Sequence, residues 1–443
     1  MDLELEIHHG GKWHTGAVVE IKEPDLGVTG ETILSYDLDY WMENAAADLH
    51  NDQTAHDLRA VSVADPVDLE NHHRKTWPPF ILDLMPSGRA RTRLADALKI
   101  DPDAKTSELP LLLRGAGSPV GNVRIRQAAE FDAERTAGMA KVGVSEDEIF
   151  GRSDRFIEIV DYFSIIASGS SGLQGVWPKV AMTKAKDGLY YPDPLVDDAD
   201  AVDHVIVKLL RSANERDAVI LSSEAIYSEI AGMIGLNVKK PSRYGNGVLI
   251  IPRFDRRIEG GNVVRLGQES MVSAANIAEF AYLGRHEDYL AVLSAVSSDP
   301  FADIVEYVKR EVANQALGNS DNHGRNTALS KDSDHTVRLS PLFDFAPMRL
   351  APEGIARSTR WGVMLRTHRD HLPDWSRVAE AIFPDDATLV RRLLDELGEF
   401  AARLGKAPAL AKELGAHEDV LGIAMARCDE IVRSLDQPAR HGA

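Results

Sequence analysis

The spacing of apolar residues changes at about residue 270. Before that point, short strand-like runs alternate with helical patches; after it, apolar residues mostly recur at three- and four-residue intervals, the pattern of amphipathic helices. The expected strands cover 16–21, 32–36, 178–182, 204–209, 247–252 and 339–345, and the expected helices cover 224–234, 304–317, 388–404 and 420–432. This order predicts a strand-rich first part and a helical second part.

Two local signals add helices to the first part. Ser145, with Glu148 three residues later, is a capping pattern that predicts a helix start. The turn Pro86-Ser87-Gly88 is followed by a basic stretch that is typical of a helix start. Residues 100–165 as a whole have a mostly helical and acidic pattern.

Length and charge limit the classes of protein to consider. With 443 residues the chain is too long for one ordinary core, so we expect two or three substructures. The formal net charge of −19 argues against broad electrostatic binding to nucleic acid, although not against a local basic patch. The acidic segment 197–203 is expected to be a solvated loop.

The cysteine content and the N-terminus indicate a compartment. Cys428 is the one cysteine, which excludes an intrachain disulfide and fits a reducing compartment. The start, Met1 to Glu6, is acidic and lacks the basic and apolar blocks of a signal peptide. Since no run reaches the length of a membrane span, we expect a cytoplasmic protein with no membrane contact.

The most informative polar segment is the loop Gly318–Asn326, followed by the run Pro341–Phe345. Asp321, Asn326 and Asp344 are the residue types that phosphoryl transfer requires: a base for the hydroxyl proton and two oxygen ligands for Mg²⁺. A solvated turn is the alternative, because Asn, Asp, Ser and Gly dominate turns. The amphipathic helix that leads into the loop and the carboxylate that ends an apolar run favour the chemical interpretation.

A glycine- and serine-rich stretch precedes the strand at 178–182. Its three glycines, at spacing three, let backbone amides approach phosphate oxygens closely, and a flexible linker is the alternative. The strand-like pattern that resumes at Pro178 favours a hairpin loop.

Lys208 interrupts the apolar strand at 204–209. Kinases place such a lysine behind a glycine-rich loop, whereas an edge-strand lysine that extends to solvent is the alternative. Glu224, in the first turn of a helix, either interacts with the helix dipole or pairs with Lys208, and Glu229 competes for that pairing.

These motifs occur in the order that a kinase requires. The glycine-rich loop, the lysine and the helix glutamate are followed by the buried strand 247–252, whose exit would meet adenine, and then by the Asp-x4-Asn loop and the second Asp. We therefore predict an α+β, two-lobed protein-kinase-like fold with a β-rich N-terminal lobe and an all-helical C-terminal lobe.

The sequence also departs from ordinary protein kinases. No His-Arg precedes Asp321, His323 follows it instead, Asp344 is followed by Phe-Ala, and no Ala-Pro-Glu element lies downstream. These particulars resemble the HipA family of bacterial serine/threonine kinases, the toxins of two-gene toxin–antitoxin modules. The similar segments are Gly318–Asn326, Pro341–Asp344, Gly172–Lys179, Arg253–Arg256, Ser35–Asp37 and Leu84–Gly88.

The resemblance implies three domains: an added N-terminal subdomain (1–110), a kinase N-lobe (111–260) and a helical C-lobe (261–443). It also implies ATP and Mg²⁺ as cofactors, Asp321 as general base, and Asn326 and Asp344 as metal ligands. The further nucleotide-binding residues it implies are Gly172, Gln174, Gly175, Lys179, Lys208, Glu224, Pro252, Phe254 and His323. For His323, a role in hydrogen-bonding the loop into shape is the interpretation we favour over a chemical role.

The family further implies autophosphorylation in the glycine-rich loop, at Ser170 or Ser171 ahead of Ser168. A phosphate there adds close to two negative charges and would repel nucleotide. The implied partners are a DNA-binding helix-turn-helix antitoxin, through which DNA would be contacted only indirectly, and a protein substrate in translation such as an aminoacyl-tRNA synthetase.

Two other functions stay open. A metal hydrolase would use Asp321, His323 and Asp344, with His335 as the nearest further ligand in the sequence. An inactive kinase fold that acts as a co-repressor with an antitoxin is the other, although the intact lysine, Asp and Asn positions count against it.

Overall fold

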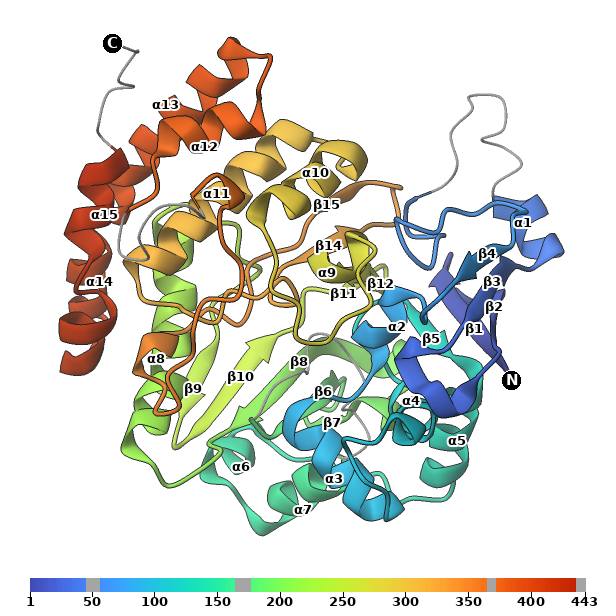
Figure 1. Cartoon of the computed structure of the whole chain (residues 1–443). Helices are drawn as coiled ribbons and strands as arrows, with labels where there is room; N and C mark the ends of the chain where they lie inside the picture. The colour runs from blue at the N-terminus through green and yellow to red at the C-terminus, as the bar shows by residue number, and fades with distance from the viewer. Residues whose placement is uncertain (45–55, 164–176, 365–371, 436–443) are drawn as a thin grey trace. The chain divides into compact units, whose positions relative to one another are not determined.

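The computed structural model describes residues 1–44, 56–163, 177–364 and 372–435 (Figure 1). Contacts within the chain divide it into two compact units, each built from separate segments. Unit 1 contains 1–211, 245–280 and 328–340, and unit 2 contains 212–244, 281–327 and 341–443. The chain therefore passes between the units five times. The predicted domains 1–110, 111–260 and 261–443 stay a prediction.

Unit 1 begins with an antiparallel sheet of order β4-β3-β2-β1-β5. Its apolar residues alternate with polar ones, and Leu3, Leu5 and Ile7 are completely buried against the helices that follow. The strands are β1 Asp2–His9, β2 Lys12–Ile21, β3 Thr32–Tyr36, β4 His72–Arg74 and β5 Val123–Ile125. The helices are α1 Leu38–Asn44, α2 Pro79–Leu84, α3 Gly88–Leu98, α4 Glu108–Gly115 and α5 Arg126–Thr136.

A second five-stranded sheet has the order β7-β6-β8-β10-β9. Its apolar residues share a core with those of α6 Glu146–Gly151 and α7 Asp154–Phe163, and Ser145 begins α6 with the predicted capping box. The strands are β6 Lys179–Ala185, β7 Tyr190–Pro192, β8 Ala201–Leu209, β9 Arg243–Gly245 and β10 Val248–Pro252.

Two small sheets complete unit 1. The hairpin β11 Arg256–Glu259 and β12 Asn262–Arg265 follows β10 directly. The other sheet joins β13 Gly267–Ser270, β14 Ala328–Lys331 and β15 Val337–Leu339, with the short helix α9 Met271–Ala274 after β13. The loop predicted to carry the catalytic residues and the second Asp are thus separated along the chain by a hairpin that belongs to unit 1.

Unit 2 is helical apart from the first two residues of β9, as far as its described residues go. Helices α10, α13 and α15 pack against α11, which leads into the Gly318–Asn326 loop. The helices are α8 Glu215–Met233, α10 His286–Val296, α11 Pro300–Ala316, α12 Trp375–Ile382, α13 Ala387–Leu404, α14 Ala407–Glu413 and α15 Cys428–Leu435.

The predicted α+β fold class is confirmed, and most predicted elements are present. The helix expected over 420–432 is wrong: a π-helical turn, Val420–Ala424, ends before α15 begins at Cys428. The segment 197–203 is not simply a solvated loop, because β8 begins at Ala201 and Asp198 binds Arg265 at 2.8 Å. No helix in the described part of the chain is long and apolar enough to cross a membrane.

Candidate functional site

The polar loop predicted as catalytic follows α11 directly, in unit 2. Gly318 begins it with a φ of +74°, and a Cβ atom there would lie only 2.4 Å from the main-chain oxygen of Ala424. Gly324 lies equally close to the ring of Tyr289, where a Cβ atom would be 2.2 Å from the hydroxyl oxygen. Glycine is therefore required at both positions, by close packing as well as by backbone conformation at Gly318.

Hydrogen bonds fix the shape of this loop from within. The Asn319 N–H donates to the Asn314 carbonyl of α11 at 2.9 Å, and the Asn319 side-chain oxygen accepts from the Asp321 N–H at 3.3 Å. The Asn326 side chain donates to the Asp321 carbonyl at 3.0 Å. His323 Nε2 lies 3.4 Å from a carboxylate oxygen of Asp321. This contact supports a loop-shaping role for His323.

Asp321, Asn326 and Asp344 line one pocket in unit 2, together with Phe343 and Thr327. All three polar side chains are partly exposed, so a ligand in the pocket can reach them. Mg²⁺ in phosphoryl-transfer sites takes one or two side-chain oxygens and completes its octahedron with phosphate and water. The side-chain amide oxygen of Asn326 and a carboxylate oxygen of Asp344 fit this need for one or two side-chain oxygen ligands.

Asp344 reaches this pocket from a backbone that is not a strand. The strand predicted over 339–345 is wrong, since β15 ends at Leu339 and Asp344 has a φ of +52° in the left-handed region. Few non-glycine residues adopt that conformation, although Asp is one of those that do. The turn explains how a polar side chain at the end of an apolar run can face a pocket.

A buried glutamate on α11, missed by the sequence analysis, supports the same loop. Glu311 is 3% exposed, pairs with Arg357 and lies 3.3 Å from His286 Nε2. Asn322 of the loop donates to its carboxylate at 3.4 Å. Burial alone would raise the pKa of Glu311, but Arg357 and His286 hold it well below its ordinary value. A charged residue within the apolar stripe of α11 was the available signal in the sequence.

The predicted phosphate-contacting lysines lie side by side in unit 1. Lys179 on β6 and Lys208 on β8 are direct cross-strand partners, so their side chains share one face of the sheet. Both are buried, and Lys208 Nζ lies 5.4 Å from the ring centre of Trp177. The guanidinium of Arg211 lies 5.0 Å from the same ring, a third cation that the sequence analysis did not single out.

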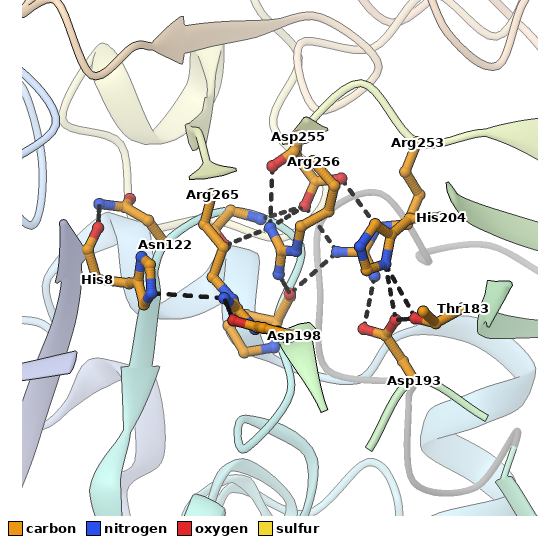
Figure 2. A network of polar contacts seen from close by, with 12 residues as sticks. His8, Asn122, Thr183, Asp193, Asp198, His204, Arg253, Asp255, Arg256 and Arg265 are labelled. Atoms are coloured by element: carbon orange, nitrogen blue, oxygen red, sulfur yellow. Dashed lines mark hydrogen bonds and ion pairs between the residues drawn. The ribbon is translucent and has the colours of Figure 1, made fainter. Parts of the chain in front are cut away.

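The segment predicted as the hinge is held by an ionic network (Figure 2). Phe254 lies two residues after Pro252, the last residue of β10, and its neighbours Arg253 and Asp255 are both buried. Arg253 binds Asp255 at 2.7 Å and Asp193 at 2.9 Å. Burial favours the neutral form of Asp255, but the guanidiniums of Arg253 and Arg256 hold the pKa of this carboxyl group well below its ordinary value. These pairs fix the backbone on both sides of Phe254.

The remaining predicted residues are not placed together. Glu224 is buried on α8 of unit 2 and Lys208 is in unit 1, so their pairing stays a prediction. Six residues lie outside the described part of the chain: Ser168, Ser170, Ser171, Gly172, Gln174 and Gly175.

The hydrolase alternative receives no support from His335. This side chain is engaged within unit 1, with its Nδ1 3.2 Å from Asp57. Among the described residues, no group of three or more His, Cys, Asp or Glu side chains is arranged to hold a metal ion.

A comparison with protein families identifies the family of this chain. The model of the HipA-like C-terminal domain matches residues 171–404, more than half of the chain. A Sinorhizobium fredii protein named "Putative kinase Y4mE" is 23% identical over 368 residues, which cover 78% of this chain and 82% of that protein.

One solved structure shows a likeness at the level of the fold. A chain of the Shewanella oneidensis toxin–antitoxin complex of HipA, HipB and operator DNA matches with a TM-score of 0.61 and 14% identity, over 98% of this chain and 96% of that one. The Helicobacter pylori kinase CtkA, also 14% identical, gives a TM-score of 0.36 over 53% of this chain and 89% of its own.

Proposed function

Because the chain belongs to the HipA family, we propose that it is an ATP- and Mg²⁺-dependent protein serine/threonine kinase. The observation that carries the proposal is that Asp321, Asn326 and Asp344 line one pocket, at the spacing and with the residue types that phosphoryl transfer uses. The paired lysines Lys179 and Lys208 support it, since two cations on one face of a sheet suit an oligophosphate.

Each residue then has a defined task. Asp321 accepts the proton of a substrate hydroxyl, whose oxygen forms a bond to the terminal phosphorus of ATP while the bond from that phosphorus to the bridging oxygen breaks and ADP leaves. Asn326 and Asp344 hold Mg²⁺, which when bound neutralises charge on the phosphates. Lys179 and Lys208 orient the nucleotide, and the main chain at Pro252 and Phe254 meets adenine. Glu311 acts through Asn322 to keep the loop in place.

We further propose that the kinase is the toxin of a cytoplasmic toxin–antitoxin module. The support is the family and the likeness to a chain from a complex that contains HipA, HipB and operator DNA. A helix-turn-helix antitoxin would make most of the DNA contacts, because this chain carries a net charge of −19. The proposed substrate is a protein of translation, such as an aminoacyl-tRNA synthetase.

Autophosphorylation in the glycine-rich stretch is the proposed means of self-inhibition, with Ser170 or Ser171 favoured over Ser168. The deciding experiment is intact mass spectrometry of phosphatase-treated protein after incubation with ATP and Mg²⁺, beside an Asp321→Ala variant. A gain of one phosphate in the wild type alone, mapped to 168–171, is the expected result. If neither this chain nor a translation extract gains phosphate while nucleotide still stabilises the fold, the chain is an inactive scaffold.

A further inference from the structure

Unit 1 contains a second pocket. Its lining includes none of the residues that we assign to the nucleotide or the metal. Three arginines from three different strands face it: Arg124 on β5, Arg256 on β11 and Arg265 on β12. We call it the arginine pocket, and its other lining residues include Trp13, Asp132 and Asp193. Figure 2 shows Arg256 and Arg265 with the carboxylates that hold them.

Each arginine is anchored by a carboxylate. Arg124 Nε donates to Glu6 at 2.7 Å, Arg256 Nη1 to Asp255 at 2.6 Å, and Arg265 Nη2 to Asp198 at 2.8 Å. Two of the arginines also lie near the Trp13 ring, whose centre is 4.0 Å from the Arg124 guanidinium and 5.8 Å from that of Arg265. Anchored guanidiniums lose little further side-chain entropy when a ligand binds, so the pocket is organised before binding.

Hydrogen-bonding capacity remains unused in this pocket. Arg265 Nε is buried and no described residue accepts a hydrogen bond from it. Asp132 is 4% exposed and lines the pocket, and its Oδ2 atom likewise has no partner among the described residues, while Oδ1 accepts from Arg135 at 3.3 Å. Buried polar atoms without partners are uncommon and point to a water or a ligand that completes them.

The charges favour an anion over a cation. Of the two carboxylates in the lining, Asp193 is already bound by Arg253 at 2.9 Å and lies 3.3 Å from His204 Nδ1. Burial raises the pKa of Asp132 to about 6, so this carboxyl group takes up a proton more readily than an exposed one, and Arg135 at 3.3 Å offsets its charge when it is ionised. Burial lowers the pKa of Arg256 to about 9. Asp255 opposes this shift, and repulsion from the neighbouring guanidiniums of Arg253 and Arg265 adds to it.

We propose that the arginine pocket binds a small oxyanion, the phosphoryl or carboxylate group of a metabolite. Guanidinium groups bind both kinds of oxyanion through paired N–H donors, and a planar indole beside them suits a flat or aromatic portion of the same ligand. The proposal does not depend on the kinase activity.

Calorimetric titration of the full chain at pH 7, with sodium chloride keeping ionic strength constant, tests the site. Inorganic phosphate and citrate are the two probes, and saturable binding of either supports the proposal and tells which oxyanion the site prefers. In Arg124→Gln we expect roughly tenfold weaker binding of that probe. The control Arg126→Gln removes an equal charge two residues away, from a side chain that pairs with Glu4 and Glu130 outside the pocket, and should bind like the wild type.

Hydrogen exchange on the unmodified chain locates the probe even if Arg124→Gln folds poorly. Bound oxyanion should slow exchange at the amides of residues 117, 118, 129, 132, 133 and 136, which line the pocket. Slowing confined to 177–180 and 206–211 would place the anion at the predicted nucleotide lysines and overturn the proposal. Absence of binding by both probes, or equal weakening in both arginine variants, would overturn it as well.

Discussion

The side-chain amide of Asn326 donates from Nδ2 to the main-chain carbonyl oxygen of Asp321, at 3.0 Å. This bond closes the loop over five residues and fixes which end of the amide is engaged. Its other end, Oδ1, is the kind of oxygen that Mg²⁺ takes as a ligand. The same contact therefore sets the loop conformation around Asp321 and the orientation of the predicted metal ligand.

Replacing Asn326 by Ala should impair both metal use and the loop. We expect phosphoryl transfer to fall by roughly 100-fold, with a higher Mg²⁺ concentration needed for half-maximal rate, because a ligand and its orienting bond are lost together. The measurement is autophosphorylation rate against Mg²⁺ concentration. Asn262→Ala, at the exposed first residue of β12, is the control. An unchanged Mg²⁺ dependence in Asn326→Ala would remove this residue from the metal site.

Asp321→Asn should separate chemistry from binding. The substitution keeps the shape of the side chain but removes its ability to accept a proton, so the transfer rate should fall by about 10²- to 10⁴-fold. Nucleotide affinity, measured by calorimetry, should stay within about threefold of the wild type. The Asp321 side chain is partly exposed, and a hydrogen bond between groups that water also solvates contributes little net free energy of binding. A fully active Asp321→Asn protein would assign the base elsewhere.

Lys208→Met should weaken nucleotide binding. A charge-assisted contact to phosphate contributes about 1.5–3 kcal/mol, so we expect the dissociation constant for ATP to rise about 10- to 100-fold. Lys184→Met is a matched control on β6, since that lysine is partly exposed and lies 5.3 Å from the Tyr190 ring centre. Equal affinities in the two variants would contradict the assignment of Lys208.

Glu311→Gln should change the pH dependence of stability. The ion pairs hold the folded-state pKa of Glu311 below its ordinary value of 4.5, so they stabilise the fold above about pH 4.5 and this contribution is lost as the pH falls further. At pH 7 the variant should lose about 1–3 kcal/mol in its free energy of unfolding, because a buried charge-assisted network is broken.

Urea unfolding of Glu311→Gln and the wild type at pH 7, 5 and 3.5 measures this effect. The difference between the two proteins should shrink as the pH falls. Glu396→Gln provides the comparison, since Glu396 pairs with Lys309 but is 43% exposed, and its loss should change stability by less than about 1 kcal/mol. A difference that is the same at every pH would show that packing, and not the charge of Glu311, stabilises the loop.

The apolar spacing was sufficient to predict elements whose local signals agree. Helix α11 was predicted from its stripe, and its true start at Pro300 follows the capping Asp299, which accepts from the Ala302 N–H at 3.2 Å. Helix α8 was predicted nine residues too short at its start, because the cap at Asn214 precedes a stretch with weak periodicity. Such boundaries depend on one or two residues and are easily misplaced.

Other features depend on contacts between distant residues. Nothing local to Asp344 signals its left-handed backbone, so the apolar run around it was taken for a strand. Arg253 and Asp193 are 60 residues apart in sequence and meet only because β7 and β10 flank β6 and β8 in one sheet. The loop Gly318–Asn326 could be singled out because its polar residues are close together in sequence, whereas the supporting Glu311 pairs with Arg357, 46 residues away.

The order in which the two units use the chain has a consequence for synthesis on the ribosome. The β13–β14–β15 sheet of unit 1 is complete only after Leu339 has emerged, although the same unit begins at residue 1. Domains usually fold as units during translation, N-terminal first. Here unit 1 cannot be completed until segments of unit 2 have been made, so a nascent chain that ends before Asp344 would lack the assembled pocket that Asp321, Asn326 and Asp344 line.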